Sequence, residues 1–248
     1  MHVHARENDG AWSADPGWYA EAIRSIRAAA AGMLISITSI RPAGTPVASI
    51  IEVLEILADN STTCPELISV NLGHIAEWNA KSGQTAHFPN DFSDIVLLLE
   101  TCADLGITPE LGVMDLGFVN NAVVLGTAGL PRASLWFLVE LDSPGYGLGP
   151  QIAPATVENY DALSQALRSQ FPGARWAAHG NGAATFSVLR RAIESGAHVR
   201  VGLEDTVVDE DGRRSAGNAE QVRWAVEAAA AAGRAPETLD QARRIIGC

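Results

Sequence analysis

The chain has 248 residues, 47% of them hydrophobic, and a formal net charge of −12. This size and composition suffice for one large core, so we expect a single domain over residues 1–248. The negative charge argues against a nucleic-acid partner, because phosphates attract Lys and Arg. No apolar run reaches the length of a membrane span, and the cysteines show no paired spacing. We therefore expect a cytoplasmic protein with no membrane partner.

Short apolar runs alternate with helical patterns along the first half of the chain. A strand ends near 3–5, and a helix over 15–31 is predicted to begin with Asp15 as N-cap and Pro16 at its first position. The next predicted elements are a strand at 33–38, a helix at 46–59, a strand at 67–71, a polar loop at 73–90, a helix at 91–105 and a strand at 110–114.

The same alternation continues through the second half. The predicted elements are a helix at 117–128, a strand at 133–140, a turn-rich loop at 144–150, a helix at 156–170, a strand at 176–178, a helix at 183–195, a strand at 198–203 and a helix at 217–232. Repeated strand–helix units imply parallel strands, and no dinucleotide-binding glycine fingerprint follows a strand. The pattern predicts an α/β fold of the TIM (β/α)8-barrel type, with the first β/α unit absent from this chain.

Two histidines stand one residue apart at the start of the chain. In a strand, His2 and His4 point to the same face, and neutral imidazole is a common metal ligand. A third candidate ligand, Glu204, follows the apolar run 198–203. Two histidines and a carboxylate leave positions open for substrate, as catalytic zinc requires. We predict that His2, His4 and Glu204 bind Zn²⁺ or another divalent metal, the alternative being a frayed terminus.

The predicted strand at 198–203 brings an unusual pair of charges together. Arg200, Gly202 and Glu204 share one face, so a cation and an anion point into the barrel. Buried opposite charges are costly unless they pair or bind something charged. A structural ion pair is one interpretation. The other assigns Glu204 to the metal and Arg200 to the anchoring of a substrate.

Polar residues stand at the ends of other predicted strands as well, where barrel enzymes carry their chemistry. Thr38 and Ser39 end one such strand, and we expect substrate binding by Arg6, Asn71, His74, Glu110 and Asn181. The loop His179-Gly180-Asn181-Gly182 precedes a predicted helix. It is either a flexible turn or a loop whose free N–H groups bind an anion at the start of that helix, such as a phosphate of coenzyme A.

Together these residues resemble one family over the whole chain, the β-keto acid cleavage enzymes. The most specific segments are His2-Val3-His4-Ala5-Arg6 and the run from Gly196 to Asp205. Similarity extends to Asp9-Gly10, Thr38-Ser39, and the segments 69–73, 109–115, 217–222 and 242–247.

The resemblance implies a TIM barrel with a divalent metal, usually zinc, held by His2, His4 and Glu204. It implies that a β-keto acid condenses with acetyl-CoA, and that cleavage then yields acetoacetate and a new CoA thioester. By the same match, Arg200 and Asp205 are catalytic or anchor the substrate, with Arg200 holding the substrate carboxylate and Asp205 acting as the base. The match also implies a catalytic hydroxyl from Thr38 or Ser39. The family is oligomeric, which implies a homo-oligomer that covers the gap beside the first strand.

Two alternatives remain. Metal-dependent amidohydrolases also place His-x-His on a barrel strand, but they need further histidines and a bridging lysine, and Lys81 falls in a predicted loop. The other alternative is a truncated barrel that keeps the fold and has lost activity. Bound metal discriminates an intact enzyme from such a remnant.

Overall fold

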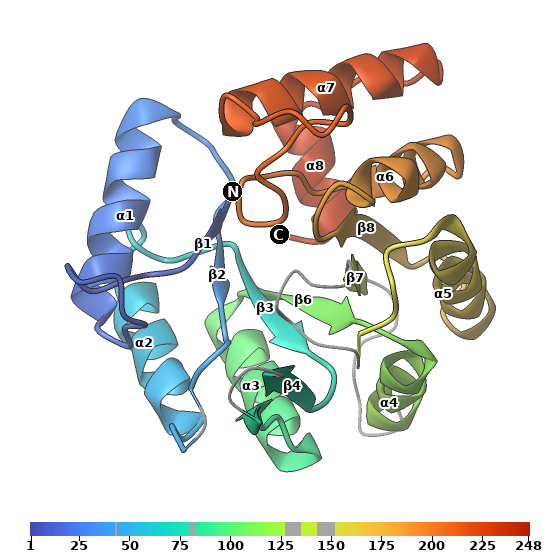
Figure 1. Ribbon diagram of the computed structural model, residues 1–248. Coiled ribbons are helices and arrows are strands. Elements are labelled where there is room, and N and C mark those ends of the chain that lie inside the picture. Colours follow the sequence, from blue (N-terminus) through green and yellow to red (C-terminus); the bar gives the residue numbers. More distant parts are fainter. Residues whose placement is uncertain (43, 80–82, 127–134, 143–151) are drawn as a thin grey trace.

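The computed structural model describes residues 1–248 apart from 43, 80–82, 127–134 and 143–151. Within the described residues, seven parallel strands form one curled sheet with helices around its outer side, and the predicted fold class is confirmed (Figure 1). In spatial order the strands are β1 (His2–Val3), β2 (Ser36–Thr38), β3 (Leu67–Asn71), β6 (Thr108–Val113), β7 (Trp136–Leu141), β8 (Arg175–Gly180) and β9 (His198–Val199).

Helices follow most of these strands and lie in chain order around the sheet (Figure 1). Those of the described segments are α1 (Pro16–Ala29), α2 (Ala48–Ala58), α3 (Phe92–Leu105), α4 (Leu116–Gly126), α5 (Val157–Gln170), α6 (Thr185–Glu194), α7 (Asn218–Ala231) and α8 (Leu239–Ile246). The helices predicted from apolar periodicity are present with small shifts at their ends. The predicted loop at 144–150 and Lys81 lie outside the described residues.

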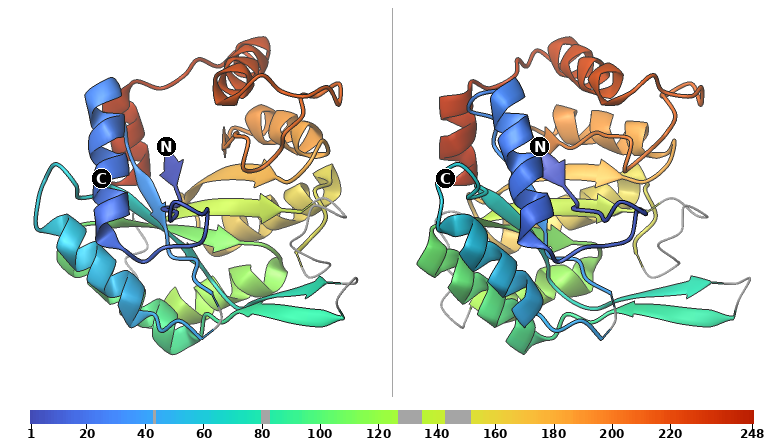
Figure 2. Two further views of the ribbon diagram at one scale, coloured as in Figure 1. Left: turned by 60° about the vertical axis from the view of Figure 1, so that its left-hand side comes forward. Right: turned by 90° about the vertical axis from the view of Figure 1, so that its left-hand side faces the viewer.

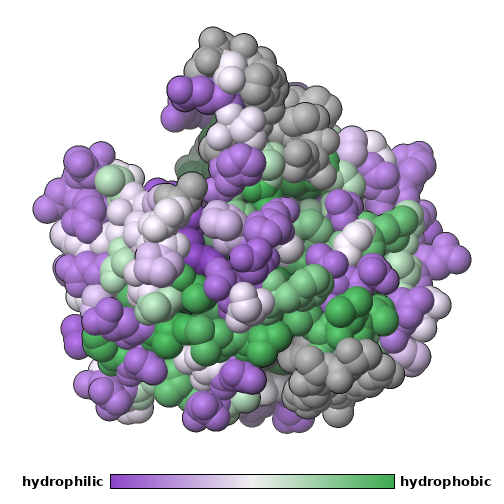
Figure 3. All heavy atoms as spheres, turned by 90° about the horizontal axis from the view of Figure 1, so that it is seen from below, coloured by the Kyte–Doolittle hydropathy of each residue, from purple (hydrophilic) through white to green (hydrophobic). Residues whose placement is uncertain are grey.

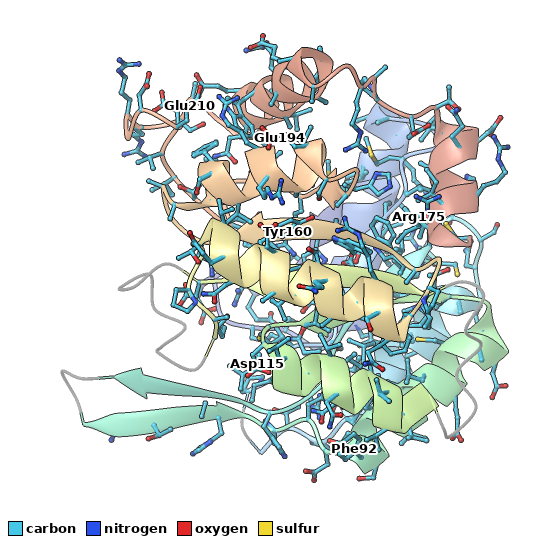
Figure 4. The ribbon with its side chains drawn as sticks, turned by 90° about the vertical axis from the view of Figure 1, so that its right-hand side faces the viewer. Phe92, Asp115, Tyr160, Arg175, Glu194 and Glu210 are labelled. Carbon is cyan, nitrogen blue, oxygen red and sulfur yellow. The ribbon has the colours of Figure 1, made fainter. Side chains whose placement is uncertain are left out.

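Side-chain caps explain where several helices begin. Asp15 accepts a hydrogen bond from Gly17 N at 2.7 Å, and Pro16 starts α1, as predicted. Asp115 accepts from Phe118 N at 2.9 Å and caps α4. Figure 4 shows Asp115 at the end of the sheet that carries the carboxyl ends of the strands, with Arg175 at the opposite end.

The core has two parts. The larger lies between the sheet and its helices and includes the fully buried Ile37 and Ile68. A smaller cluster, built from residues such as Leu67 and Trp136 near the starts of strands, packs against Ile245 of α8. Helix α8 was not predicted, because it has only eight residues. A capping box formed by Thr238 and Gln241 was the available sequence signal.

Residues 73–90, predicted as a polar loop, instead contain an antiparallel hairpin of β4 (Ile75–Asn79) and β5 (Gln84–Phe88). Ile75 pairs with Phe88, and both pack on Met114. The hairpin projects from the body of the protein (Figures 2 and 3). The loop prediction was wrong because only the base of the hairpin is anchored by apolar side chains, so the alternation expected of a strand is weak.

The sheet is an open barrel whose edges are β1 and β9, and these two strands do not pair with each other in the described part of the chain. The strand predicted at 198–203 is regular only over His198–Val199. It ends early because Asp205 N and Thr206 N both donate to Gly202 O, which closes a turn. Among the described helices, none is long and apolar enough to cross a membrane.

We predict that Tyr160→Phe destabilises the fold. Tyr160 of α5 is fully buried, and its hydroxyl lies 2.7 Å from Ser195 Oγ and 3.3 Å from Trp176 Nε1 (Figure 4). Its loss leaves the buried Trp176 Nε1 without this acceptor, while Ser195 Oγ keeps its bond to Ala192 O, so urea unfolding should show a free energy of unfolding lower by about 1–2 kcal/mol. The exposed Glu194, changed to Gln, is the control with unchanged stability. Equal stability of both variants would contradict the prediction.

Candidate functional site

Two histidines and a glutamate converge between the two edges of the sheet. His2 Nε2 lies 3.1 Å from His4 Nε2, and His4 Nε2 lies 2.9 Å from Glu204 Oε1. One potential ligand atom of each residue lies within 4.8 Å of the other two. The chain thus brings the three residues predicted as metal ligands to one point, although they come from its opposite ends.

Pairing of β1 with β2 fixes the first of these histidines. His2 pairs with Ser36, and His2 Nδ1 lies 3.1 Å from Ser36 Oγ, which orients the ring with Nε2 toward His4. Burial, helped by the charge of Arg200, holds the pKa of His2 well below its usual value. The imidazole is therefore neutral near pH 7 and offers a lone pair, as a metal ligand must.

This donor set fits a divalent cation. Two imidazole nitrogens only 3.1 Å apart repel through their lone pairs unless a proton or a cation lies between them. The Glu204 side chain is 49% exposed, so one side of the cluster is open to solvent. Two imidazoles and a carboxylate beside an open side are the ligands of catalytic zinc sites.

Arg200 contacts both acidic residues of the following turn. Its Nη2 lies 2.9 Å from Glu204 Oε2 and 2.9 Å from Asp205 Oδ1, and Nε donates to Asp205 Oδ2 at 3.3 Å. Burial disfavours the charged form of Arg200. The negative charges of Asp205 and Glu204 outweigh this effect and raise the pKa of Arg200. The predicted pairing of Arg200 with Glu204 is present. However, Glu204 is half exposed and lies in the turn rather than in a strand.

Glu204 is held as a carboxylate by the same contacts. Its partial burial opposes ionisation, but the hydrogen bond with His4 and the charge of Arg200 keep the pKa of Glu204 below its usual range. An ionised carboxylate is the protonation state that metal ligation by Glu204 requires.

Two site residues were missed as ligand or catalytic candidates. His179 of β8 lies between two carboxyl groups, with Nε2 3.4 Å from Glu140 Oε2 and Nδ1 3.3 Å from Asp205 Oδ1. Its side chain is buried. Glu140 interrupts the apolar run of β7, and a charge inside a buried strand was the signal that could have found it.

These groups line one cavity of about 240 Å³ at the carboxyl ends of the strands. Its lining residues are His2, His4, Thr38, Ile40, Ser69, Asn71, Ile75, Phe88, Met114, Leu138, Glu140, His179, Asn181, Arg200, Glu204 and Asp205. Polar groups from both edges and from the central strands therefore meet above an apolar layer, as in ligand sites of α/β barrels.

The remaining predicted site residues divide into two groups. Thr38, Asn71 and Asn181 line the cavity. The others do not: Ser39 and Glu110 are buried outside its lining, Arg6 is exposed, and His74 is exposed and paired with Asp91 at 2.8 Å. Of the two candidate hydroxyls, Thr38 is the one on the cavity wall.

In the loop at 179–182, three N–H groups already donate hydrogen bonds within the protein. Gly180 N donates to Thr185 Oγ1, Asn181 N donates to Leu141 O, and Gly182 N donates to Asp205 O, each at 2.9 Å. These three N–H groups are therefore not free to bind an anion, because helix α6 begins only at Thr185 and the groups form hydrogen bonds within and around the loop. They hold Asp205 close to β8 instead.

Comparison with known proteins adds independent findings. The sequence model of the beta-keto acid cleavage enzyme matches residues 1–248. The 3-keto-5-aminohexanoate cleavage enzyme of Fusobacterium nucleatum is 26% identical over 246 residues, which cover 99% of this chain and 82% of that protein. The 3-oxoadipate:acetyl-CoA acetyltransferase of Cupriavidus necator is 24% identical over 253 residues, covering 100% and 80%.

Solved structures agree on the fold. The apo structure of ObcA superposes with a TM-score of 0.80 at 17% identity, covering 99% of this chain and 60% of ObcA. A ternary complex of ObcA with a C4-CoA adduct and oxalate gives a TM-score of 0.72 at 16% identity, covering 100% and 62%. The chain thus spans about three fifths of the length of these solved proteins.

We predict that Glu110 makes folding stability depend on pH. Glu110 accepts a hydrogen bond from Trp136 Nε1 at 2.9 Å, yet burial raises its pKa despite that bond and the charge of Arg200. As pH rises above the usual Glu pKa, the unfolded chain releases this proton first. Stability therefore falls until the raised pKa is reached. Glu110→Gln cannot titrate at this position. In urea unfolding, its free energy of unfolding relative to that of wild type should therefore increase between about pH 5 and pH 8.

The control for this experiment is Glu158→Gln, because Glu158 is exposed on α5. Its stability should follow the wild-type curve. Parallel wild-type and Glu110→Gln curves across the same range would show that Glu110 ionises as easily in the folded protein as in the unfolded chain.

Proposed function

Since the chain belongs to the family of β-keto acid cleavage enzymes, we propose that it condenses a β-keto acid with acetyl-CoA and cleaves the adduct to acetoacetate and a new CoA thioester. The observation that carries the proposal is one cavity in which the cluster of His2, His4 and Glu204 adjoins the paired Arg200 and Asp205. The names of the two curated relatives, one for cleavage of a β-keto acid and one for acetyl-CoA acetyl transfer, support it.

We propose that His2, His4 and Glu204 hold Zn²⁺ or another divalent cation. When bound, such a cation polarises a keto oxygen and stabilises the negative charge that develops there. Support comes from the short distances among the three ligand atoms and from the neutral state of His2. The contact of His2 with Ser36 supplies the outer support that metal-binding histidines usually have.

Asp205 is the proposed base. Arg200 donates two hydrogen bonds to its carboxylate, and the turn that contains it is tied to Gly182. Held in this way, Asp205 takes a proton from the methylene carbon between the ketone and the carboxylate of the substrate. That carbon attacks the acetyl carbonyl of acetyl-CoA, and the CoA thiolate leaves.

Cleavage follows from the same arrangement. The CoA thiolate attacks the former ketone carbon of the β-keto acid, and the bond between this carbon and the methylene carbon breaks. Asp205 returns its proton to the carbon that becomes acetoacetate. The original acyl chain leaves as the new CoA thioester, so all atoms of both substrates are accounted for. We propose that the Thr38 hydroxyl assists as a hydrogen-bond donor, because it lies on the cavity wall.

Arg200 is the proposed anchor for the substrate carboxylate. Its Nε and Nη2 groups donate to the acidic turn, whereas Nη1 makes no hydrogen bond to any described residue. The guanidinium can therefore orient Asp205 and still offer two N–H donors to an anion in the cavity.

Assembly and location are further proposals. We propose a homo-oligomer, supported by exposed apolar side chains such as Phe92, Leu97 and Leu116 on α3 and α4. The face shown in Figure 3 carries a broad apolar area. A cytoplasmic location fits the scattered cysteines, which are Cys64, Cys102 and Cys248.

We predict that the purified chain with added zinc converts acetyl-CoA and a β-keto acid to acetoacetate and a new CoA thioester, both detectable by mass spectrometry. His4→Ala and Glu204→Ala should lose the bound zinc, measured by elemental analysis, together with the activity, because each removes one of three ligands.

His74→Ala is the matched control, because His74 is an exposed histidine outside the cavity lining. It should keep both zinc and activity. Unchanged zinc in both His4→Ala and Glu204→Ala would exclude the proposed ligands. Hydrolysis of an amide or ester without CoA transfer would instead favour the hydrolase alternative.

We predict that Arg200→Lys lowers kcat/KM by about 100-fold, because an ammonium cannot reproduce the two-pronged contact that orients Asp205. Steady-state kinetics measures the effect. Arg190→Lys, at an exposed Arg that pairs with Glu210, is the control. Near wild-type kcat/KM in Arg200→Lys would rule out both the orienting and the anchoring role.

A further inference from the structure

A second cavity lies at the amino ends of β8 and β9, whereas the candidate site lies at the carboxyl ends of the strands. Figure 4 shows Arg175, which lines this second cavity, at the end of the sheet opposite to Asp115. Its volume is about 150 Å³, and among the described residues its lining includes Arg168, Arg175 and His198 but no Asp or Glu. In a protein whose formal net charge is −12, this amino-end pocket is therefore a local region of positive charge.

Strand register places Arg175 beside His198. Ala177 of β8 pairs with His198 of β9, and Arg175 stands two residues before Ala177, so the side chains of Arg175 and His198 lie on the same face of the sheet. The ring of His198 rests against that of Trp136, with centroids 5.5 Å apart. The guanidinium of Arg175 is exposed and makes no hydrogen bond or ion pair with any described residue. A cation with unused donors therefore stands next to an imidazole.

Arg168 is held in place on another wall of the pocket. Its Cζ lies 5.1 Å from the centroid of the Trp176 ring, and its Nη2 donates to Ser195 O at 3.0 Å. The Trp176 ring is itself fixed, because Nε1 donates to the Tyr160 hydroxyl. These contacts leave Nε and Nη1 of Arg168 without a hydrogen bond to any described residue. Arg168 is thus oriented in advance and keeps N–H donors for a ligand.

The surroundings of the pocket add positive charge. Arg234 Nη1 donates to Ala197 O at 2.6 Å, so a further guanidinium lies behind the wall. Burial, followed by the charges of Arg234 and Arg175, lowers the pKa of His198 against the opposing charge of Glu237. Near pH 7 the imidazole is neutral and offers one N–H donor. The pocket therefore combines two guanidinium groups and an imidazole donor, and it lacks an anion.

The donors and the volume define the ligand. Guanidinium groups bind phosphate oxygens through two parallel hydrogen bonds. The three donors come from α5, β8 and β9, and donors from separate directions suit a tetrahedral oxyanion better than a planar carboxylate. The volume is well below the roughly 300–1,000 Å³ of cavities that take drug-sized ligands, which excludes a whole nucleotide or coenzyme A from the pocket.

We propose that Arg168, Arg175 and His198 bind phosphate, either as the free ion or as the phosphate group of a small molecule. This site is separate from the cavity that contains His2, His4 and Glu204 and does not depend on the proposed function. Because the ion contacts α5, β8 and β9 together, it ties the edge strand β9 to its neighbours and stabilises the fold.

Isothermal titration of the purified chain at constant ionic strength compares inorganic phosphate, methyl phosphate, acetate and chloride. Phosphate should bind one site per chain with a Kd of about 1 mM or tighter, and acetate and chloride at least about tenfold more weakly. Binding of methyl phosphate would identify a phosphate group on a small molecule as a ligand, and its exclusion would identify the free ion; both results support the site. Equal binding of acetate and phosphate would overturn the choice of a tetrahedral oxyanion.

Variants locate the bound ion. Arg175→Gln removes an exposed side chain that contacts no described residue, so the fold should persist while phosphate binds at least about tenfold more weakly. Arg168→Gln should weaken binding as well. The control is Arg213→Gln, which removes the same charge at an exposed position paired with Asp211 and should bind like wild type. Phosphate should raise the Tm of wild type but not of Arg175→Gln.

Nuclear magnetic resonance of the chain isotopically labelled in its six histidine rings reports the position of the ion directly. The ring signals of His198, assigned with His198→Gln, should move when phosphate is added, and those of the histidines in the candidate site should stay. Movement confined to the candidate site, or phosphate binding that is undiminished in Arg175→Gln and Arg168→Gln, would overturn the proposal. Absence of any phosphate binding to wild type would overturn it too, with the proposed function unaffected.

Discussion

The contacts of Glu204 with His4 and with Arg200 are the interactions on which the site depends. Strands β1 and β9 lie at opposite edges of an open barrel and do not pair within the described residues, so side chains must set their relative position. The turn closed on Gly202 presents Glu204 to His4, just after β1, and Asp205 to Arg200 and His179. One short turn therefore couples the metal-ligand cluster to the proposed base.

These contacts contribute little to the folding stability of the protein. Glu204 is half exposed, and ion pairs at such positions typically contribute about 0–1 kcal/mol. The buried, neutral His2 gains from His4 at most one hydrogen bond between ring nitrogens. A divalent cation would instead take all three groups as its ligands. We infer that ligand binding, rather than folding, accounts for this cluster.

Much of the fold was predictable because helix and strand periodicities are local properties. That His2 and Glu204 meet at one site was predictable because they stand beside predicted strands at positions where barrels carry chemistry, whereas their binding of a metal remains a proposal. The hairpin at 75–88 was not, since its base alone is apolar. His74 shows the limit of position as a guide: it follows a strand, yet its side chain turns outward to Asp91. Side-chain direction after a strand end depends on the turn, which short-range patterns do not specify.

Glu140 shows what tertiary context adds. In the sequence it is one charge within an apolar strand, which by itself indicates only that a partner exists. The partner His179 lies on the next strand, and the room for the second carboxyl oxygen comes from Gly112 on the strand before. Parallel register brings Glu140 level with His179, and Gly112 level with Asn71. Three adjacent strands must therefore be aligned before the role of Gly112 can be recognised: without a side chain of its own, it leaves room for the side chains of Asn71 and Glu140 on the two neighbouring strands.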